Sequence, residues 1–511
     1  MRFQADKRPA PGTSCGHSDR RDYWRLIGLA LVLATTWSRG AIAADRCETL
    51  RTLRLPAVTI VSVANIRKDE PIDLPWGREP AKLGAAACRV RAIARPSADS
   101  LIRFEVWIPE GVAWNGKYLQ VGNGGFAGQL PLFSILDGVR RGYAVAGTDD
   151  GHQTSDSTDA QWALGHPEKI RDFGDRALKA THDAAQKITI AYTGRKPHLA
   201  YFQGCSDGGR EALMVVQRYP RDYNGVVAGA PAAYWTTLME GGAALGRRVA
   251  DPAARIPKSK LPALQRAALA ACGGSVSYVA DPASCHFNPE NLLCGARDDD
   301  SCLTAPQLAT AHAIYDGLML TTAPGPGSGT APGAEAASGS WSYWITGESD
   351  DTQALPQGIK YAWNYFAYLV RRDPAFSFSS LTTEDARRST TELGPLLNAD
   401  DPDLGRFRRH GGRLLQYHGW NDPAIPASHS RAYYTSVVAK LGDPSDFYKL
   451  YFVPGMLHCA GGPGPSGVDW LRHLEDWVER GQAPGEVIAS HSPRDAAPAG
   501  ASQRLVPFQA R

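Results

Sequence analysis

The chain has 511 residues, of which 43% are hydrophobic and 21% are charged. This length and composition fit one large globular domain with insertions or two to three smaller domains, and they exclude a chain that is disordered throughout. The formal net charge of +3 is small, and no basic stripe interleaved with aromatic residues is present, so we expect no nucleic-acid partner.

The first segment of the chain is typical of an export signal. A basic flank precedes an apolar run from Leu26 to Ala34, and the small-x-small pattern Ala41-Ile42-Ala43 follows. The apolar run is too short to span a bilayer comfortably. We predict a signal peptide over residues 1–43, with Arg20-Arg21 a weak indication of the twin-arginine route. An uncleaved amphipathic anchor is the less favoured alternative.

Removal of this segment changes the charge and the cysteine count. Residues 1–43 carry seven Lys or Arg and three Asp, a charge of +4, so the chain's +3 becomes about −1. Of nine cysteines, Cys15 leaves and eight remain, and an even number in an exported protein indicates disulfides. We therefore predict a secreted or periplasmic protein with no membrane segment after cleavage. A zinc site, without a CxxC pair, is the less favoured interpretation of four cysteines: Cys272, Cys285, Cys294 and Cys302.

Strand and helix patterns alternate along the chain. Short apolar, aromatic or β-branched runs predict buried strands at 101–109, 117–122, 143–148, 198–204, 224–230, 413–419 and 447–454. Helical patterns lie between several of them. One covers 172–194, and another covers 469–482 with four apolar residues on one face, namely Trp470, Leu471, Leu474 and Trp477. This alternation predicts an α/β fold with a mostly parallel sheet.

The alternation breaks between about Trp235 and Arg408. This stretch holds a Pro/Gly/Ser-rich tract at 321–340, which we expect to be a mobile loop, and an aromatic-dense run at 341–369. We predict a lid domain over residues 235–408, inserted between two parts of one core domain, 44–234 and 409–511.

The pentapeptide Gly204-Cys205-Ser206-Asp207-Gly208 fits G-x-S-x-G. It follows a predicted strand and opens a predicted helix, which is the position of a nucleophile elbow. The pentapeptide alone recurs by chance, and the strand and helix on either side make it informative. We predict Ser206 as a catalytic nucleophile.

A serine needs a base and a group that orients the base. In an α/β-hydrolase the chain order is Ser, then Asp or Glu, then His, each after a strand. Asp422 follows the strand at 413–419, and His458 follows the strand at 447–454. His418 remains a second candidate for the base. The remaining histidines that we weighed are more typical of structural or surface groups: His152, His166 and His429.

Each end of this predicted triad has a cysteine beside it, Cys205 before Ser206 and Cys459 after His458. If Ser206 and His458 are within hydrogen-bond reach, their neighbours can approach the separation that a disulfide needs. We predict a Cys205–Cys459 disulfide. A buried free cysteine and a cysteine nucleophile are the alternatives at position 205.

Backbone N–H groups are needed to stabilise the oxyanion. The N–H of Asp207, directly after the nucleophile, is one candidate, and the glycine-rich turn after the strand at 117–122 offers Gly124 or Gly125. A phosphate-binding loop is disfavoured because no Lys-Ser/Thr follows and the GxGxxG spacing is incomplete.

These motifs together resemble the tannase/feruloyl esterase family, which also contains a terephthalate monoester hydrolase. The resemblance rests on "GCSDGGRE", "HGWNDPAIP" and "VPGMLHCAGGPG", with "GNGGFAG", "TDDGH", "QRYPRDYNGVVAGAPA" and "WVERGQAP" as further blocks. It implies an α/β-hydrolase core, helices on both faces of the sheet, a lid, the triad Ser206, Asp422 and His458, and oxyanion donors at Gly125 and Asp207. By similarity the other disulfides would be Cys47–Cys88, Cys272–Cys285 and Cys294–Cys302.

The sequence departs from the family at its calcium loop. Relatives often carry CDxxDGxxDG, whereas this chain has "CGGSVSYVADPASC" at 272–285, with Asp281 as its single carboxylate. The acidic run Asp298-Asp299-Asp300 is a conceivable substitute, but a solvated loop is the favoured interpretation. Calcium takes six to eight oxygen ligands, so we predict no bound metal and no cofactor.

The resemblance implies hydrolysis of aromatic esters through an acyl-enzyme. We rank hydroxycinnamoyl (feruloyl) esters first, then gallate (tannin) esters, then terephthalate monoesters. The expected partner is a small aromatic ester, free or attached to plant cell-wall polysaccharide. A serine peptidase and a non-catalytic secreted protein that binds phenolics or carbohydrate are the alternatives. The residues that bind substrate are not identified, although lid aromatics are candidates: Trp235, Trp341, Tyr343, Trp344, Tyr361, Trp363, Tyr365 and Phe366.

Overall fold

The computed structural model describes residues 46–74, 78–272, 277–320, 329–348 and 354–510. The predicted signal peptide, residues 1–43, lies outside the described residues. Nine strands form the main sheet in the order β1-β2-β3-β5-β4-β6-β7-β8-β9. The strands are β1 (Val58–Ile66), β2 (Ala87–Ala94), β3 (Ile102–Pro109), β4 (Lys117–Val121), β5 (Ala144–Thr148), β6 (Leu199–Cys205), β7 (Gly225–Gly229), β8 (Arg413–Gly419) and β9 (Tyr448–Val453).

Most of the sheet is parallel. The pairs β5·β4, β4·β6, β6·β7, β7·β8 and β8·β9 are parallel, whereas β1, β2, β3 and β5 pair antiparallel in turn. All seven predicted strands are present, and the predicted α/β fold is confirmed. Two strands at one edge, β1 and β2, were not predicted, and neither was the separate hairpin of β10 (Val487–Ser490) and β11 (Ser502–Leu505).

Helices cover both faces of the sheet. One apolar cluster joins the sheet to α4 (Ala177–Thr193), α5 (Asp207–Arg218), α12 (Gly405–Arg409) and α13 (Ala427–Leu441). A second cluster joins the opposite face to α2 (Leu132–Arg140) and α14 (Trp470–Arg480). Burying these apolar faces stabilises the fold, by about 1.5–3 kcal/mol for each fully buried large side chain. The layered arrangement is that of a doubly covered parallel sheet.

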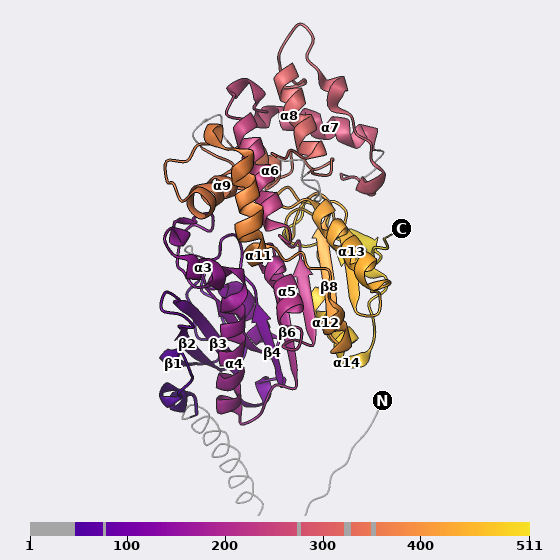
Figure 1. Cartoon of the computed structure of the whole chain (residues 1–511). Helices are drawn as coiled ribbons and strands as arrows, with labels where there is room; N and C mark the ends of the chain where they lie inside the picture. The colour runs from indigo at the N-terminus through magenta and orange to yellow at the C-terminus, as the bar shows by residue number, and fades with distance from the viewer. Residues whose placement is uncertain (1–45, 75–77, 273–276, 321–328, 349–353, 511) are drawn as a thin grey trace, which may run out of the picture.

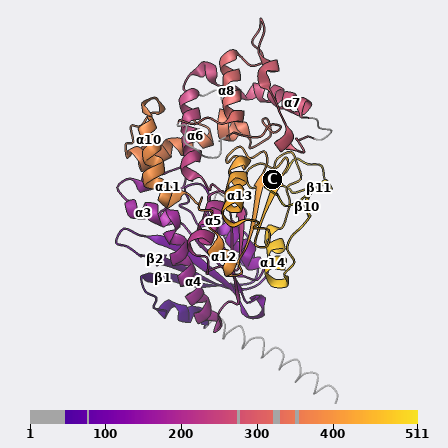
Figure 2. The same cartoon turned by 45° about the vertical axis from the view of Figure 1, so that its right-hand side comes forward.

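The insertion between β7 and β8 is mostly helical. Figure 1 shows its helices α6, α8 and α9 stacked above the sheet, and Figure 2 shows the same layer from a second side. The insertion contains α6 (Trp235–Arg248), α7 (Leu261–Ala271), α8 (Ala305–Asp316), α9 (Gln357–Asn364), α10 (Thr383–Arg388) and α11 (Gly394–Leu397), and the short helix α3 (Pro167–Arg171) precedes it in the core.

Two apolar clusters pack the insertion. One joins α6, α9 and the π-helical segment Tyr365–Arg371 to residues outside the insertion, among them Phe126 and Phe173, and another lies around α7 and α8. Residues 329–340 of the expected mobile loop form no helix or strand, and Glu335 and Ser340 in this part are buried. Residues 321–328 lie outside the described residues. The domain limits 44–234, 235–408 and 409–511 stay a prediction.

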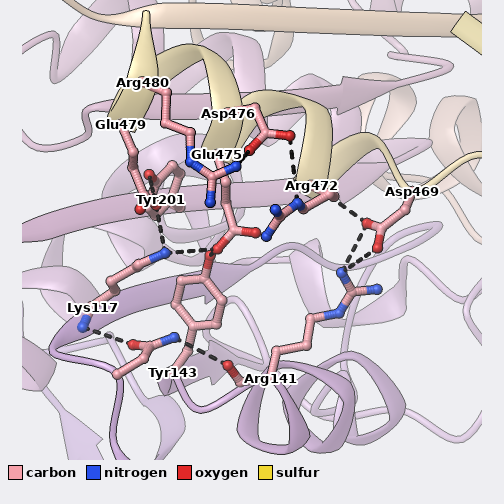
Figure 3. A network of polar contacts seen from close by, with 11 residues as sticks. Lys117, Arg141, Tyr143, Tyr201, Asp469, Arg472, Glu475, Asp476, Glu479 and Arg480 are labelled. Carbon is pink, nitrogen blue, oxygen red and sulfur yellow. Dashed lines mark hydrogen bonds and ion pairs between the residues drawn. The ribbon is translucent and has the colours of Figure 1, made fainter. Parts of the chain in front are cut away.

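Helix α14 is held against the sheet by charge as well as by apolar contact. The predicted face of Trp470, Leu471, Leu474 and Trp477 is buried. Figure 3 shows Lys117 of β4 between Glu475 and Glu479, with Nζ–O distances of 2.8 and 2.5 Å. Because Lys117 and Glu475 are largely buried, this ion pair is screened less than a surface pair. No helix in the described ranges is both long and apolar enough to cross a bilayer.

Candidate active site

Ser206 lies in the sharp turn between β6 and α5. Its φ of 69° and ψ of −123° are rare for a residue with a side chain. The turn is packed so closely that glycine is required on both sides. A Cβ on Gly204 would lie 2.3 Å from the carbonyl oxygen of Gly208, and a Cβ on Gly208 would lie 2.7 Å from the carbonyl oxygen of Asn123. The hydroxyl of Ser206 therefore stands at the N-terminus of α5, in the geometry of a nucleophile elbow.

Two hydrogen bonds connect Ser206 to an acid through a histidine. The Ser206 Oγ lies 2.8 Å from His458 Nε2, and His458 Nδ1 lies 2.7 Å from Asp422 Oδ2. Asp422 follows β8, and His458 follows β9. The carboxyl ends of neighbouring parallel strands meet at one edge of a sheet, so residues 252 positions apart come into contact. The three predicted triad residues are thus brought together.

Asp422 is buried and held by several donors. Its Oδ1 accepts the N–H groups of Ala424 and Ile425 at 2.8 and 2.9 Å. Its Oδ2, besides contacting His458, lies 3.3 Å from Nε2 of His418. Burial alone would raise the pKa of Asp422, but the interactions with His458 and His418 outweigh it and hold this pKa below the ordinary carboxyl range. Asp422 is therefore ionised and fixed in orientation.

His418, the second candidate base, lies behind the acid and away from the serine. Its Nε2 lies 2.9 Å from the carbonyl oxygen of Ile425, and its Nδ1 lies 2.6 Å from the hydroxyl of Ser430. It is 0% exposed. Because both ring nitrogens have protein partners, His418 is not placed to accept the proton of Ser206, and its contact with Asp422 helps to orient that acid. His458 contacts the hydroxyl of Ser206 directly.

The remaining histidines are structural or peripheral. His152 stacks on Trp162 at 3.9 Å and bonds to the carbonyl oxygen of Phe126 through Nε2. Burial lowers the pKa of His152 to about 3, so its ring is neutral. Burial likewise lowers the pKa of His429 to about 3. His166 pairs with Asp99 at the surface.

A disulfide joins the serine loop to the histidine loop. Cys205 and Cys459 are bonded, with their Cα atoms 6.0 Å apart. The other three pairs are those that the resemblance implied: Cys47–Cys88, Cys272–Cys285 and Cys294–Cys302. Since all eight cysteines of the described chain are paired, neither a zinc site at the four lid cysteines nor a free thiol at position 205 is present.

Removal of the Cys205–Cys459 bond should reduce both stability and activity. We expect Cys205→Ala/Cys459→Ala to lose about 2–5 kcal/mol of unfolding free energy, because a long loop is no longer closed in the unfolded chain. It should also lower kcat about tenfold, since a small displacement between serine and histidine slows the reaction. Thermal unfolding and ester hydrolysis at 20 °C measure the two effects.

The matched control for this prediction is Cys47→Ala/Cys88→Ala, which removes a disulfide at the far edge of the sheet. It should lower stability while kcat at 20 °C stays near that of the parent. Equal losses of kcat in the two variants would show that the Cys205–Cys459 bond has no specific effect on the site.

Both predicted oxyanion donors lie beside the serine. Gly125 has a φ of +63° and lines the same pocket as Ser206 and Asp207. A side chain there would meet the hydroxyl oxygen of Tyr361 at 2.4 Å, so glycine is required, whereas a Cβ on Gly124 would meet nothing. Asp207 is the first residue of α5, where an N–H has no acceptor within the helix. The geometry favours Gly125 over Gly124.

An apolar pocket opens at Ser206. It holds about 950 Å³ of space free of protein atoms, including space open to solvent. Its walls come from the oxyanion loop, from α6, α8 and α9 of the insertion, and from the loop after Asp422, and they include Leu238, Met239, Ile314, Ile359 and Ile425. Among the described residues that line it there is no Lys, Arg or His.

The eight candidate lid aromatics divide into two groups. Trp235, Trp344 and Tyr361 line the pocket, and Trp344 packs edge-on against His458 at 5.3 Å. The others do not line it: Trp341, Tyr365 and Phe366 are buried in the insertion, Trp363 packs against the same apolar core, and Tyr343 is 41% exposed.

The stretch expected to replace the calcium loop offers few ligands. Asp281 is the single carboxylate between Cys272 and Cys285, and residues 273–276 lie outside the described residues. The acidic run is engaged with the protein, with Asp298 bound to Lys260 and Asp300 bound to Ser259. These residues do not fit a cation that takes six to eight oxygen ligands, and the absence of a metal stays a prediction.

A buried charged cluster, which was not predicted, lies under the elbow. Asp150, Asp207 and Glu211 each place a carboxylate oxygen within 4.8 Å of the others, and Arg210 pairs with Asp207 at 2.6 Å. The charged residues of "SDGGRE" after the serine were a signal, because they occur in an otherwise buried helix. Their partner Asp150 is too distant in sequence to be recognised.

Known proteins are similar to this chain over most of its length. A family model described as tannase and feruloyl esterase matches residues 88–511. An uncharacterized esterase of Xanthomonas campestris pv. campestris is 37% identical over 535 residues, which cover 92% of this chain and 89% of that protein. A probable feruloyl esterase B-1 of Aspergillus fumigatus is 28% identical over 512 residues and 93% of each chain.

Among solved structures, feruloyl esterase B from Aspergillus oryzae is similar with a TM-score of 0.83 and 24% identity, covering 91% of this chain and 96% of that one. This likeness shows the fold. The family model covers most of the chain, and the 37% identical relative covers nearly all of it. The chain therefore belongs to the tannase and feruloyl esterase family and is a carboxylic ester hydrolase of that type.

Proposed function

We propose that this protein is an exported serine esterase that hydrolyses uncharged aromatic esters of the hydroxycinnamoyl (feruloyl) type. The observation that carries the proposal is the chain of hydrogen bonds Ser206–His458–Asp422 at the opening of an apolar pocket. A relative named as a probable feruloyl esterase supports the acyl group. Four disulfides support an oxidising compartment.

The proposed reaction is two-step acyl transfer. Ser206 Oγ attacks the ester carbonyl carbon while His458 Nε2 takes the hydroxyl proton, and Asp422 stabilises the imidazolium. The N–H groups of Gly125 and Asp207 bind the oxyanion. His458 then gives its proton to the departing alcohol as the C–O bond breaks. Water, deprotonated by His458, attacks the acyl-enzyme and releases the acid and Ser206.

The pocket lining favours an uncharged acyl group. A terephthalate monoester carries a free carboxylate, and burying it with no cationic partner is costly. A galloyl group carries three adjacent hydroxyls that need polar partners, whereas the lining offers few polar side chains, among them Thr330 and Tyr361. A hydroxycinnamoyl group presents a longer apolar surface to Leu238, Met239 and Ile359.

The test is a panel of esters with the mature chain. We expect methyl ferulate to exceed the hydroxyethyl monoester of terephthalate in kcat/KM by about tenfold or more, which corresponds to at least about 1.4 kcal/mol of transition-state binding. Methyl gallate should be intermediate. Rates are followed by chromatography of the released acids.

A neutral diester of terephthalate is the control for charge, because it has the same ring and no carboxylate. It should be hydrolysed faster than the monoester. Turnover of the monoester at or above the ferulate rate would contradict the proposed acyl specificity. Binding without turnover of every ester would indicate a non-catalytic protein.

A further inference from the structure

A group of buried charges lies directly beneath the elbow and plays no part in the proposed proton transfers. Asp150, Asp207 and Glu211 are at most 1% exposed, and Arg210 is 0% exposed. Arg210 donates to Asp207 and to the carbonyl oxygens of Phe173 and Gly174. Three carboxylates face one cation, so full ionisation would leave two uncompensated negative charges in a site closed to water.

Protonation within the cluster would offset this excess charge. Burial, with the neighbouring charge of Asp207, raises the pKa of Glu211 to about 7. Burial and the charge of Glu211 raise the pKa of Asp150 well above its ordinary value. Both oxygens of Asp150, Oε1 of Glu211 and Oδ2 of Asp207 find no hydrogen-bond donor among the described residues, so a proton held within the cluster would give one of these oxygens a donor. Three side chains are too few for calcium, which takes six to eight oxygens.

The other oxygen of Glu211 holds the oxyanion loop. Glu211 Oε2 accepts the N–H of Asn123 at 3.0 Å, and the carbonyl oxygen of Asn123 accepts the N–H of Gly208 at 2.9 Å. Asn123 is therefore tied at both its N–H and its carbonyl to α5. Its side chain also donates to the carbonyl oxygen of Thr148 at 2.8 Å. The two bonds to α5 couple the loop that carries Gly125 to the helix that begins at Asp207.

We propose that Glu211 is a positioning residue that fixes the separation of the two oxyanion donors, the N–H groups of Gly125 and Asp207. This inference rests on the proposed function. Glu211 touches no reacting atom; it holds Asn123, and Asn123 sets the oxyanion loop against the first turn of α5. Close approach is required there, because a Cβ on Gly122 would lie 2.5 Å from Glu211 Oε2.

The test compares two substitutions of similar length. Glu211→Gln keeps an oxygen for the N–H of Asn123 and gives Asp150 an amide donor, so kcat should stay within about threefold of the parent. Glu211→Met removes the acceptor. We expect kcat on methyl ferulate to fall about 10- to 100-fold, since loss of one oxyanion donor costs about 10²–10³, while KM changes less than threefold.

A pH profile provides a second readout. As pH rises through about 7, the raised pKa of Glu211, this carboxyl ionises beside Asp150, Asp207 and the cation Arg210, so repulsion from the other carboxylates should move Glu211 off Asn123. The parent should therefore lose kcat on the alkaline side, and Glu211→Gln should not show this loss. An equal loss of kcat at alkaline pH in the parent and in Glu211→Gln would overturn the proposal. This comparison does not depend on Glu211→Met, which removes a buried polar contact.

Glu335→Met is the matched control, because Glu335 is also 0% exposed and accepts a backbone N–H, that of Gly333, at 2.8 Å in the insertion. It should lower thermal stability with kcat near that of the parent. Equal kcat losses in Glu335→Met and Glu211→Met would overturn the positioning role.

The rate at which a fluorophosphonate labels Ser206, followed by mass spectrometry, separates this inference from the proposed function. Labelling also develops charge on an oxygen in the oxyanion site and requires no ester substrate. It should slow about 10-fold or more in Glu211→Met and little in Glu211→Gln. If the parent labels rapidly and hydrolyses none of the esters, the substrate assignment fails and the positioning role is still tested. Equal labelling rates in the Met and Gln variants would contradict the positioning role.

Discussion

Ser206→Ala should abolish ester hydrolysis while the protein remains folded. Ser206 is the hydroxyl that contacts Nε2 of His458, so its removal leaves the base without a nucleophile. We expect kcat to fall by about 10⁴-fold or more, with a residual rate from water bound near the oxyanion donors. The Cβ remains, so the unusual backbone at position 206 and the pocket should persist.

The measurement is steady-state hydrolysis of methyl ferulate, with ferulate binding and thermal unfolding as checks on the pocket and fold. Ser157→Ala is a matched control, because Ser157 bonds the hydroxyl of Tyr361 near the oxyanion loop but does not contact His458. It should keep kcat within a few-fold. Retention of more than about 1% of activity by Ser206→Ala would require another nucleophile.

The main strands could be predicted because a buried parallel strand is a short, nearly continuous apolar run. The edge of the sheet was harder. Strand β2 carries Arg89 and Arg91, which look like surface residues in the sequence, yet both bind Glu105 of β3. These ion pairs allow two arginines to lie within the strand. They form only when β2 and β3 lie side by side, so the sequence of β2 alone does not indicate them.

The triad could be predicted for a related reason. Its three residues follow strands that lie together in a parallel sheet, so chain order alone points to Ser206, Asp422 and His458. The residues that line the pocket could not be predicted. Trp341 and Trp344 are three residues apart, and only tertiary packing places Trp341 in the core of the insertion and Trp344 against His458. The charged residues after Ser206 gave a signal of the acid cluster, but its full membership could not be predicted, since Asp150 and Glu211 meet across 61 positions.

Asp422→Asn should also produce a large loss of activity. Asp422 accepts from His458 Nδ1 and from two backbone N–H groups. An amide at this position cannot stabilise the imidazolium that forms as Ser206 loses its proton. Its NH₂ group can also face Nδ1, which favours the tautomer whose Nε2 carries a proton and cannot accept one. We expect kcat to fall about 10³- to 10⁴-fold, with KM little changed.

The volume of the side chain is preserved, but its buried charge is lost, so stability must be followed as well. In the parent, Asp422 has a lowered pKa, and such a group stabilises the fold above its unfolded pKa and loses this effect as pH falls. The parent should therefore lose stability as the pH falls below about 5. The stability of Asp422→Asn should depend less on pH in this range. Thermal unfolding at pH 4 and pH 7 measures this.

His418→Gln separates the two histidines that share Asp422. His418 lies 3.3 Å from the acid, bonds to Ser430 and the carbonyl oxygen of Ile425, and does not contact Ser206. Its loss should lower kcat about tenfold or less, by loosening Asp422, whereas His458→Gln should match Asp422→Asn or exceed it. The opposite order, with His418→Gln inactive and His458→Gln active, would make His418 the base and would require a different orientation of this loop during the reaction.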